Sequence, residues 1–117
     1  IYLIESSSIK LLQATTNDGK TPAHFAAQNG KVEVLKYLAE QDIRLDVPRS
    51  SNGMTPAHEA AYNGLVHVLD FLARIDKKLL QATASDGAAP VHYAASNGHV
   101  NVLDVVMIVQ IILDAIF

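Results

Sequence analysis

One ten-residue pattern occurs three times in this chain of 117 residues, and the spacing of its copies constrains the fold more than any other feature. The segment TPAHFAAQNG begins at Thr21, TPAHEAAYNG begins at Thr55, and a looser copy, APVHYAASNG, begins at Ala89, so each copy starts 34 residues after the one before. Two series of glycines keep the same step: Gly19, Gly53 and Gly87, and Gly30, Gly64 and Gly98. A fixed period of this length indicates a stack of similar units, because one unit alone cannot bury its apolar face.

Each unit is predicted to contain two short helices. Thr21 is a favourable N-cap, and Pro22 suits the first helical position because its missing N–H would be unpaired there in any case. The first helix is expected to run for about eight residues and to end at Asn-Gly, where glycine accepts the left-handed conformation. The second helix carries apolar residues at helical spacing, in the first unit Val32, Val34, Leu35 and Leu38. Isolated helices of under about 12 residues are marginal in water, so the units must stack.

The segments before the three copies are predicted to form fingers with tight tips. Each segment contains an Asp-Gly or Asn-Gly pair, at residues 18–19, 52–53 and 86–87. Such pairs favour a hairpin turn when extended residues flank them, so a short β-hairpin finger is expected in every unit. The third copy departs from the pattern at its helix start, where Ala89 replaces threonine and removes a cap oxygen worth about 1 kcal/mol.

The repeated residues resemble the ankyrin repeat, whose signature is T-P-L-H-x-A with a period near 33 residues. Here the signature is TPAHFA at 21–26, TPAHEA at 55–60 and APVHYA at 89–94, and the resemblance covers roughly residues 9–106. It implies an all-α repeat solenoid of stacked helix–turn–helix units with short β-hairpin fingers. A single array would then span residues 1–117, with the tail of a preceding repeat at 1–16 and repeats at 17–50, 51–84 and 85–117. The departures are the period of 34, alanine or valine in place of leucine, and a Gly-His pair only at Gly98-His99.

Composition excludes several functional classes. The formal net charge is −3 and the longest basic cluster is Lys77-Lys78, so the sequence does not indicate nucleic-acid binding. The chain has no cysteine, which rules out disulfides and thiolate metal sites and fits a reducing compartment. Nucleophile elbows, phosphate-binding loops and dinucleotide fingerprints are missing from the sequence. We therefore expect a non-enzymatic intracellular protein, located in the cytoplasm, that uses no cofactor.

The three recurring histidines, His24, His58 and His92, could be metal ligands or parts of the scaffold. Packed helices lie about 8–10 Å apart, whereas zinc–nitrogen bonds are about 2.0–2.1 Å long, so histidines of successive units cannot share one ion. The resemblance implies a structural histidine that forms hydrogen bonds near the start of the first helix. Glu59, within a helical turn of His58 and Tyr62, suggests acid–base chemistry but comes without a nucleophile, so we expect it to be a surface carboxylate.

The positions that vary between copies are the candidates for binding. The resemblance places partner contacts at the finger tips and on the exposed side of the first helices. The predicted contact residues are Asp18, Lys20, Asn52 and Met54 in the fingers and Phe25, Gln28, Glu59, Tyr62, Tyr93 and Ser96 in the helices. Aromatic side chains are enriched in interface hot spots, although Phe25 and Tyr93 could instead fill core space. These residues predict a protein–protein interaction module, a scaffold or adaptor that binds through its concave face and hairpin tips.

The last segment, residues 105–117, is apolar except for Gln110 and Asp114. It is too short to span a bilayer, which needs about 20 apolar residues, so a membrane role is not expected. Three alternatives remain: a surface covered by a following element, a long helix that packs on another copy or domain, and the start of a membrane segment. The array could thus be the recognition arm of a larger enzyme or membrane protein. It could also self-associate through Ile108, Ile111, Ile112 and Ile116.

Overall fold

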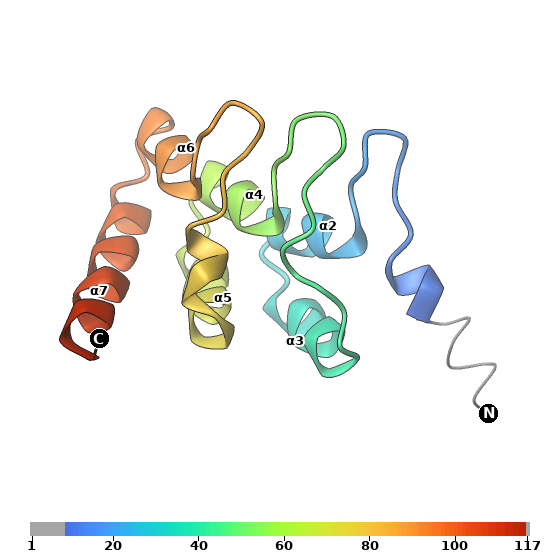
Figure 1. The fold of residues 1–117 in the computed structure, drawn as a ribbon, viewed down its shortest axis with the longest axis horizontal. Coiled ribbons are helices and arrows are strands. Elements are labelled where there is room, and N and C mark those ends of the chain that lie inside the picture. The colour runs from blue at the N-terminus through green and yellow to red at the C-terminus, as the bar shows by residue number, and fades with distance from the viewer. Residues whose placement is uncertain (1–8, 117) are drawn as a thin grey trace.

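The fold is a stack of helical pairs, seen in a computed structural model that describes residues 9–116 (Figure 1). Residues 9–12 are helical, and the elements that follow are α2 (Pro22–Gln28), α3 (Val32–Glu40), α4 (Pro56–Tyr62), α5 (Val66–Ile75), the 3-10 helix η1 (Lys77–Leu80), α6 (Pro90–Ser96) and α7 (Val100–Ile116). The first helices α2, α4 and α6 form one layer, and the second helices α3, α5 and α7 form the other. The predicted all-α repeat solenoid is therefore confirmed. The predicted tail at residues 1–16 lies within the described part only from residue 9.

The first helices begin and end where the repeat predicts. α2 and α4 start at a proline after an extended threonine, and each ends at an asparagine followed by a glycine with positive φ. α6 starts in the same way after Ala89, which has no side-chain oxygen to cap the helix. At this helix start the Ala89 N–H donates to His92 Nδ1 at 2.9 Å. As the sequence predicts, the start of α6 has no side-chain cap from residue 89.

The core lies between the two layers and combines small and large side chains. The first helices contribute alanines that are almost completely buried, and the second helices contribute Leu35, Leu38, Leu69 and Leu72, each at most 1% exposed. Alanine lets the neighbouring backbones approach closely, and leucine fills the remaining space. Val34 belongs to the predicted apolar set but is 45% exposed, so only part of that set faces the core.

The fingers are turns, and the predicted β-hairpins are not confirmed, because residues 9–116 contain no strand. Backbone hydrogen bonds close each finger, among them Thr16 N to Lys20 O at 3.0 Å, Arg49 N to Met54 O at 2.8 Å and Ala84 N to Ala88 O at 2.8 Å. Successive fingers are also bonded to each other, through Ser51 N to Asp18 O at 3.2 Å and Ser85 N to Asn52 O at 3.0 Å. The fingers therefore form one continuous row along an edge of the array.

Glycine is required where successive fingers approach each other closely. Gly53 has φ +74°, and a Cβ atom on it would lie 2.7 Å from the backbone nitrogen of Ser85. Any side chain there would push the second finger away from the third and break the bond between them.

The last helix departs from its equivalents in length. α7 has 17 residues, whereas α3 has 9 and α5 has 10. Five of its described apolar side chains are more than half exposed: Val100, Met107, Ile108, Ile111 and Ile112. No helix within the described residues is long and apolar enough to cross a membrane. The side chain of Ile116, predicted to take part in self-association, lies outside the described set.

Candidate functional site

The histidines of the first two copies join one repeat to the next. His24 is fully buried, and its Nδ1 accepts hydrogen bonds from the Thr21 backbone N–H at 3.0 Å and the Thr21 hydroxyl at 2.8 Å. Its Nε2 donates to the carbonyl of Met54, at the end of the next finger, at 2.8 Å. These partners assign the proton to Nε2. The ring therefore braces its own helix start and ties it to the following repeat.

The second copy reproduces this arrangement and the third does not. His58 accepts from the Thr55 N–H at 3.0 Å and from its hydroxyl at 2.9 Å, and donates to the Ala88 carbonyl at 2.8 Å. His92 is exposed and keeps only the backbone N–H partner. Burial lowers the pKa of the first two histidines below the usual 6.5, which keeps the rings neutral. The predicted structural role is confirmed for His24 and His58. No group of three His, Cys, Asp or Glu side chains among the described residues is placed to hold a metal.

Two further histidines link the second helices to the preceding repeat, and the sequence reading missed them. His67 Nε2 donates to the Gly30 carbonyl at 3.2 Å, and His99 Nε2 donates to the Tyr62 carbonyl at 2.9 Å. Asn97 Nδ2 also donates to the Tyr62 carbonyl at 2.9 Å. Sequence signals were available for both, since His99 directly follows Gly98 and His67 lies three residues after Gly64, the glycines that come after α6 and α4.

An arginine of the second finger joins the first finger to the first helix of the second repeat. Arg49 Nη1 donates to Glu59 Oε1 at 3.1 Å, and Nη2 bonds to Asp18 Oδ2. Glu59 is only 5% exposed, so the expectation that it is a surface carboxylate is wrong. The Glu59 carboxylate can be buried because the Arg49 guanidinium pairs with it. Arg49 occupies a position that is threonine in the other repeats, at residues 15 and 83, and this exception was the signal that sequence reasoning overlooked.

Asp18 belongs to the same cluster although its side chain is 43% exposed. Its pKa lies below the usual 3.8, chiefly because the Thr16 hydroxyl donates to the carboxylate and also because Arg49 bonds to it. The predicted tip residue is thus part of a clamp that joins the first finger to the second. The Asp18 carboxylate is partly exposed, but both of its oxygens are already bonded, one to the Thr16 hydroxyl and one to Arg49.

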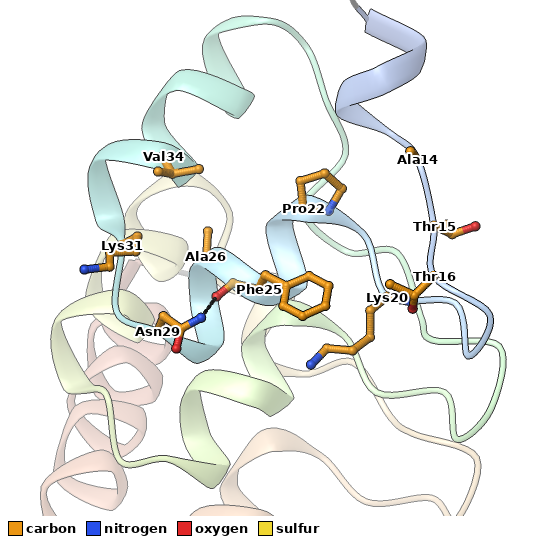
Figure 2. A pocket seen from close by; sticks show the side chains of 10 residues that line it. All are labelled: Ala14, Thr15, Thr16, Lys20, Pro22, Phe25, Ala26, Asn29, Lys31 and Val34. Atoms are coloured by element: carbon orange, nitrogen blue, oxygen red, sulfur yellow. Dashed lines mark hydrogen bonds between the residues drawn. The ribbon is translucent and has the colours of Figure 1, made fainter.

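Phe25, Lys20 and Gln28 form the first accessible group. The Phe25 ring is 42% exposed, and the Lys20 Nζ lies 4.3 Å from its centroid, a cation–π arrangement. The same Nζ bonds to the side-chain oxygen of Gln28. Figure 2 shows the Phe25 ring and the Lys20 side chain close together among the residues that line an open groove. The groove has a volume of about 710 Å³, and Val34 contributes to its lining from α3. Sequence positions 20, 25 and 28 therefore do meet.

Tyr62 and Tyr93 form the second accessible group. Their ring centroids are 6.4 Å apart at 55°, and Tyr62 is 49% exposed. Tyr93 is half-buried, packs edge-on against His58 at 5.5 Å, and donates its hydroxyl hydrogen to Asp86 Oδ2 at 3.3 Å. Burial, followed by the charge of Asp86, raises the pKa of Tyr93. Tyr93 thus contacts the buried His58 and remains partly accessible to solvent.

The remaining predicted residues differ in accessibility. Met54 is buried at 8% exposure, and its N–H donates to the half-buried Asn52 side chain at 3.0 Å. Ser96 is exposed at the end of α6. The structure thus brings the predicted residues together as an aromatic–lysine group, a tyrosine pair and a charge clamp.

The family comparison covers almost the whole chain. A model described as ankyrin repeats, in three copies, matches residues 2–81 and 49–110. The comparison with curated proteins finds no match. Helix pairs and fingers follow the 34-residue period of the sequence, and so do the buried cross-repeat histidines His24 and His58. The chain belongs to the ankyrin-repeat family.

Proposed function

We propose that the array is a non-catalytic scaffold or adaptor that binds a segment of a partner protein across its first helices and fingers. Ankyrin repeats are in general protein–protein interaction modules. The observation that carries the proposal is the pair of accessible aromatic groups, one around Phe25 and one formed by Tyr62 and Tyr93. Both come from first helices, and buried aromatic anchors dominate the binding energy of most interfaces.

Rigidity supports the same proposal. The fingers are bonded to each other, and His24, His58 and Arg49 tie successive repeats together. A surface held in this way loses little conformational entropy on binding, so more of the contact energy appears as affinity. Buried Met54 and Glu59 contribute by supporting this surface from beneath.

Paired variants on the two layers test the proposal. Phe25→Ala and Tyr62→Ala remove exposed rings from the first-helix layer, and Tyr37→Ala removes a ring of similar exposure, 53%, from the second-helix layer. In quantitative pull-downs read by mass spectrometry, specific partners should bind wild type and Tyr37→Ala equally. They should bind the other two variants about tenfold less or weaker. Full binding by variants that keep their helical circular dichroism would place the site elsewhere.

A second candidate function follows from α7. Its exposed isoleucines suit a covering domain, which would make the array the recognition arm of a larger enzyme or membrane protein, or a second copy of the chain. Ile111→Asp distinguishes self-association, since analytical ultracentrifugation should show a concentration-dependent mass for wild type and a monomer for the variant. A wild-type monomer at high concentration rules self-association out. A cytoplasmic location remains a prediction for microscopy of the tagged full-length protein.

A further inference from the structure

The first repeat holds a cation on its own aromatic ring. Lys20 comes from the finger and Phe25 and Gln28 come from α2, and together they fix the ammonium 4.3 Å from the ring centroid (Figure 2). The ring attracts the charge through its quadrupole, and the amide oxygen of Gln28 accepts one of the ammonium hydrogens. The first repeat thus shows how a finger and a first helix can hold a basic side chain over an aromatic ring.

The third repeat keeps the ring and lacks the cation. The residues two periods on from Lys20, Phe25 and Gln28 are Ala88, Tyr93 and Ser96, so the lysine has become alanine and the glutamine has become serine. Tyr62 of the preceding repeat adds a second ring at 6.4 Å from Tyr93. The space that a lysine side chain occupies in the first repeat is therefore not filled by the equivalent residue of the third.

The third repeat also has a carboxylate without a basic partner. Asp86 is equivalent to Asp18, which Arg49 neutralises in the first repeat. Asp86 instead accepts two neutral hydrogen bonds, from the Ala88 N–H at 3.0 Å and the Tyr93 hydroxyl at 3.3 Å. Within residues 9–116 it forms no ion pair with a lysine or arginine.

The electrostatic surroundings of the tyrosine pair agree with this. The negative charges of Asp86 and Glu59 both raise the pKa of Tyr93, although burial raises it more. His58, which packs edge-on against the Tyr93 ring, is kept neutral by burial and brings no positive charge. The group therefore combines two aromatic faces with negative potential, the combination that attracts an organic cation.

We propose that Tyr62, Tyr93 and Asp86 form a subsite for a lysine or arginine side chain of the bound partner segment. The partner's cation takes the place over the ring that Lys20 takes in the first repeat, and it pairs with the carboxylate. This inference rests on the proposed function, since it names the chemistry that one part of the concave layer recognises. It predicts a partner segment with a basic residue at one defined position.

A selection with a defined probe tests the subsite. A library of random 12-residue peptides displayed on phage is selected on the full chain, and the recovered peptides are synthesised and measured by isothermal titration calorimetry. Peptides that lose affinity with Tyr62→Ala should share a lysine or arginine at one aligned position. Replacing that residue by norleucine should weaken binding to wild type about tenfold.

Two variants then address the subsite without removing a ring. Ala88→Lys with Ser96→Gln rebuilds the internal lysine and amide of the first repeat, and Asp86→Asn keeps the acceptor for the Ala88 N–H while removing the charge. Both should weaken the selected peptides about tenfold and bind the norleucine peptide as wild type does. Circular dichroism and the thermal midpoint confirm that each variant is folded.

The outcomes separate the two proposals. Peptides that require Tyr62 but show no basic residue, or that bind Ala88→Lys/Ser96→Gln at full strength, overturn the cation subsite and leave the concave-face proposal standing. A library that yields no peptide sensitive to Tyr62→Ala or Phe25→Ala overturns both. A preference for peptides with a lysine or arginine, lost in both Asp86→Asn and Ala88→Lys/Ser96→Gln, supports both proposals.

Discussion

Truncating the recurring histidine should be costly in the first two copies and cheap in the third. His58→Ala removes two hydrogen bonds from Thr55 and one to the Ala88 carbonyl. Each is worth about 1 kcal/mol net, and Thr55, at 3% exposure, cannot recover its bonds from water. The cavity left by a fully buried ring adds about 1 kcal/mol, which gives a loss of about 3–5 kcal/mol. His92→Ala breaks one exposed bond and should cost about 1 kcal/mol or less.

Urea denaturation followed by circular dichroism measures the difference. His24→Ala should cost as much as His58→Ala, because His24 has the equivalent three hydrogen bonds, two from Thr21 and one to the Met54 carbonyl. A stability of about 0.05–0.15 kcal/mol per residue means that either loss lowers the midpoint strongly. An equal cost for His92→Ala and His58→Ala would refute the reasoning, since the cross-repeat bond would then not be the source of the stability. So would a cost for His58→Ala below about 1 kcal/mol.

Three further outcomes follow from the structure. Burial holds the pKa of His24 and His58 below 6.5, so their contribution to the free energy of unfolding is complete above that pH. The contribution is lost as the pH falls below 6.5, by up to about 1.4 kcal/mol per pH unit for each histidine. Urea midpoints that stay constant from pH 8 to 5 would contradict this. Gly64→Ala and Gly98→Ala both strain a positive φ, but only at Gly64 would the Cβ lie 2.6 Å from His99 Nδ1, so Gly64→Ala should lower the thermal midpoint further. Arg49→Leu leaves the buried Glu59 unpaired and should cost about 3–5 kcal/mol in urea, whereas Arg49→Leu/Glu59→Leu should recover most of that loss; equal stabilities for the two would argue against the clamp.

The sequence predicts the helix starts and ends because they depend on local backbone chemistry. Thr-Pro begins a helix and Asn-Gly ends one in any surroundings, so α2 and α4 appear where the pattern places them. The predicted β-hairpins are not confirmed, for a related reason. An Asp-Gly pair specifies a tight turn but not the strands on either side of it. Here the fingers satisfy backbone groups by bonding to each other, as Ser51 does to Asp18.

The candidate site was predicted less completely, because burial depends on the neighbours of a residue. Position 25 and its equivalents, Phe25, Glu59 and Tyr93, are alike in the sequence pattern, yet they are exposed, buried and half-buried. The pattern identifies all three as variable positions. It does not show that Arg49 draws the glutamate inward, since that contact joins residues of different elements.

The sequence by itself determined the repeat and its helices, since these follow from short-range backbone chemistry and a regular period, and the resemblance that the repeat carries implied a structural role for the histidines. Only the tertiary structure decided which variable side chains remain accessible. It left Phe25 with its own cation, covered Glu59 with a guanidinium, and placed Tyr93 beside an acid without a basic partner among the described residues. The physical reason is that charge pairing and burial are properties of contacts between repeats, and these contacts exist only once the units have stacked.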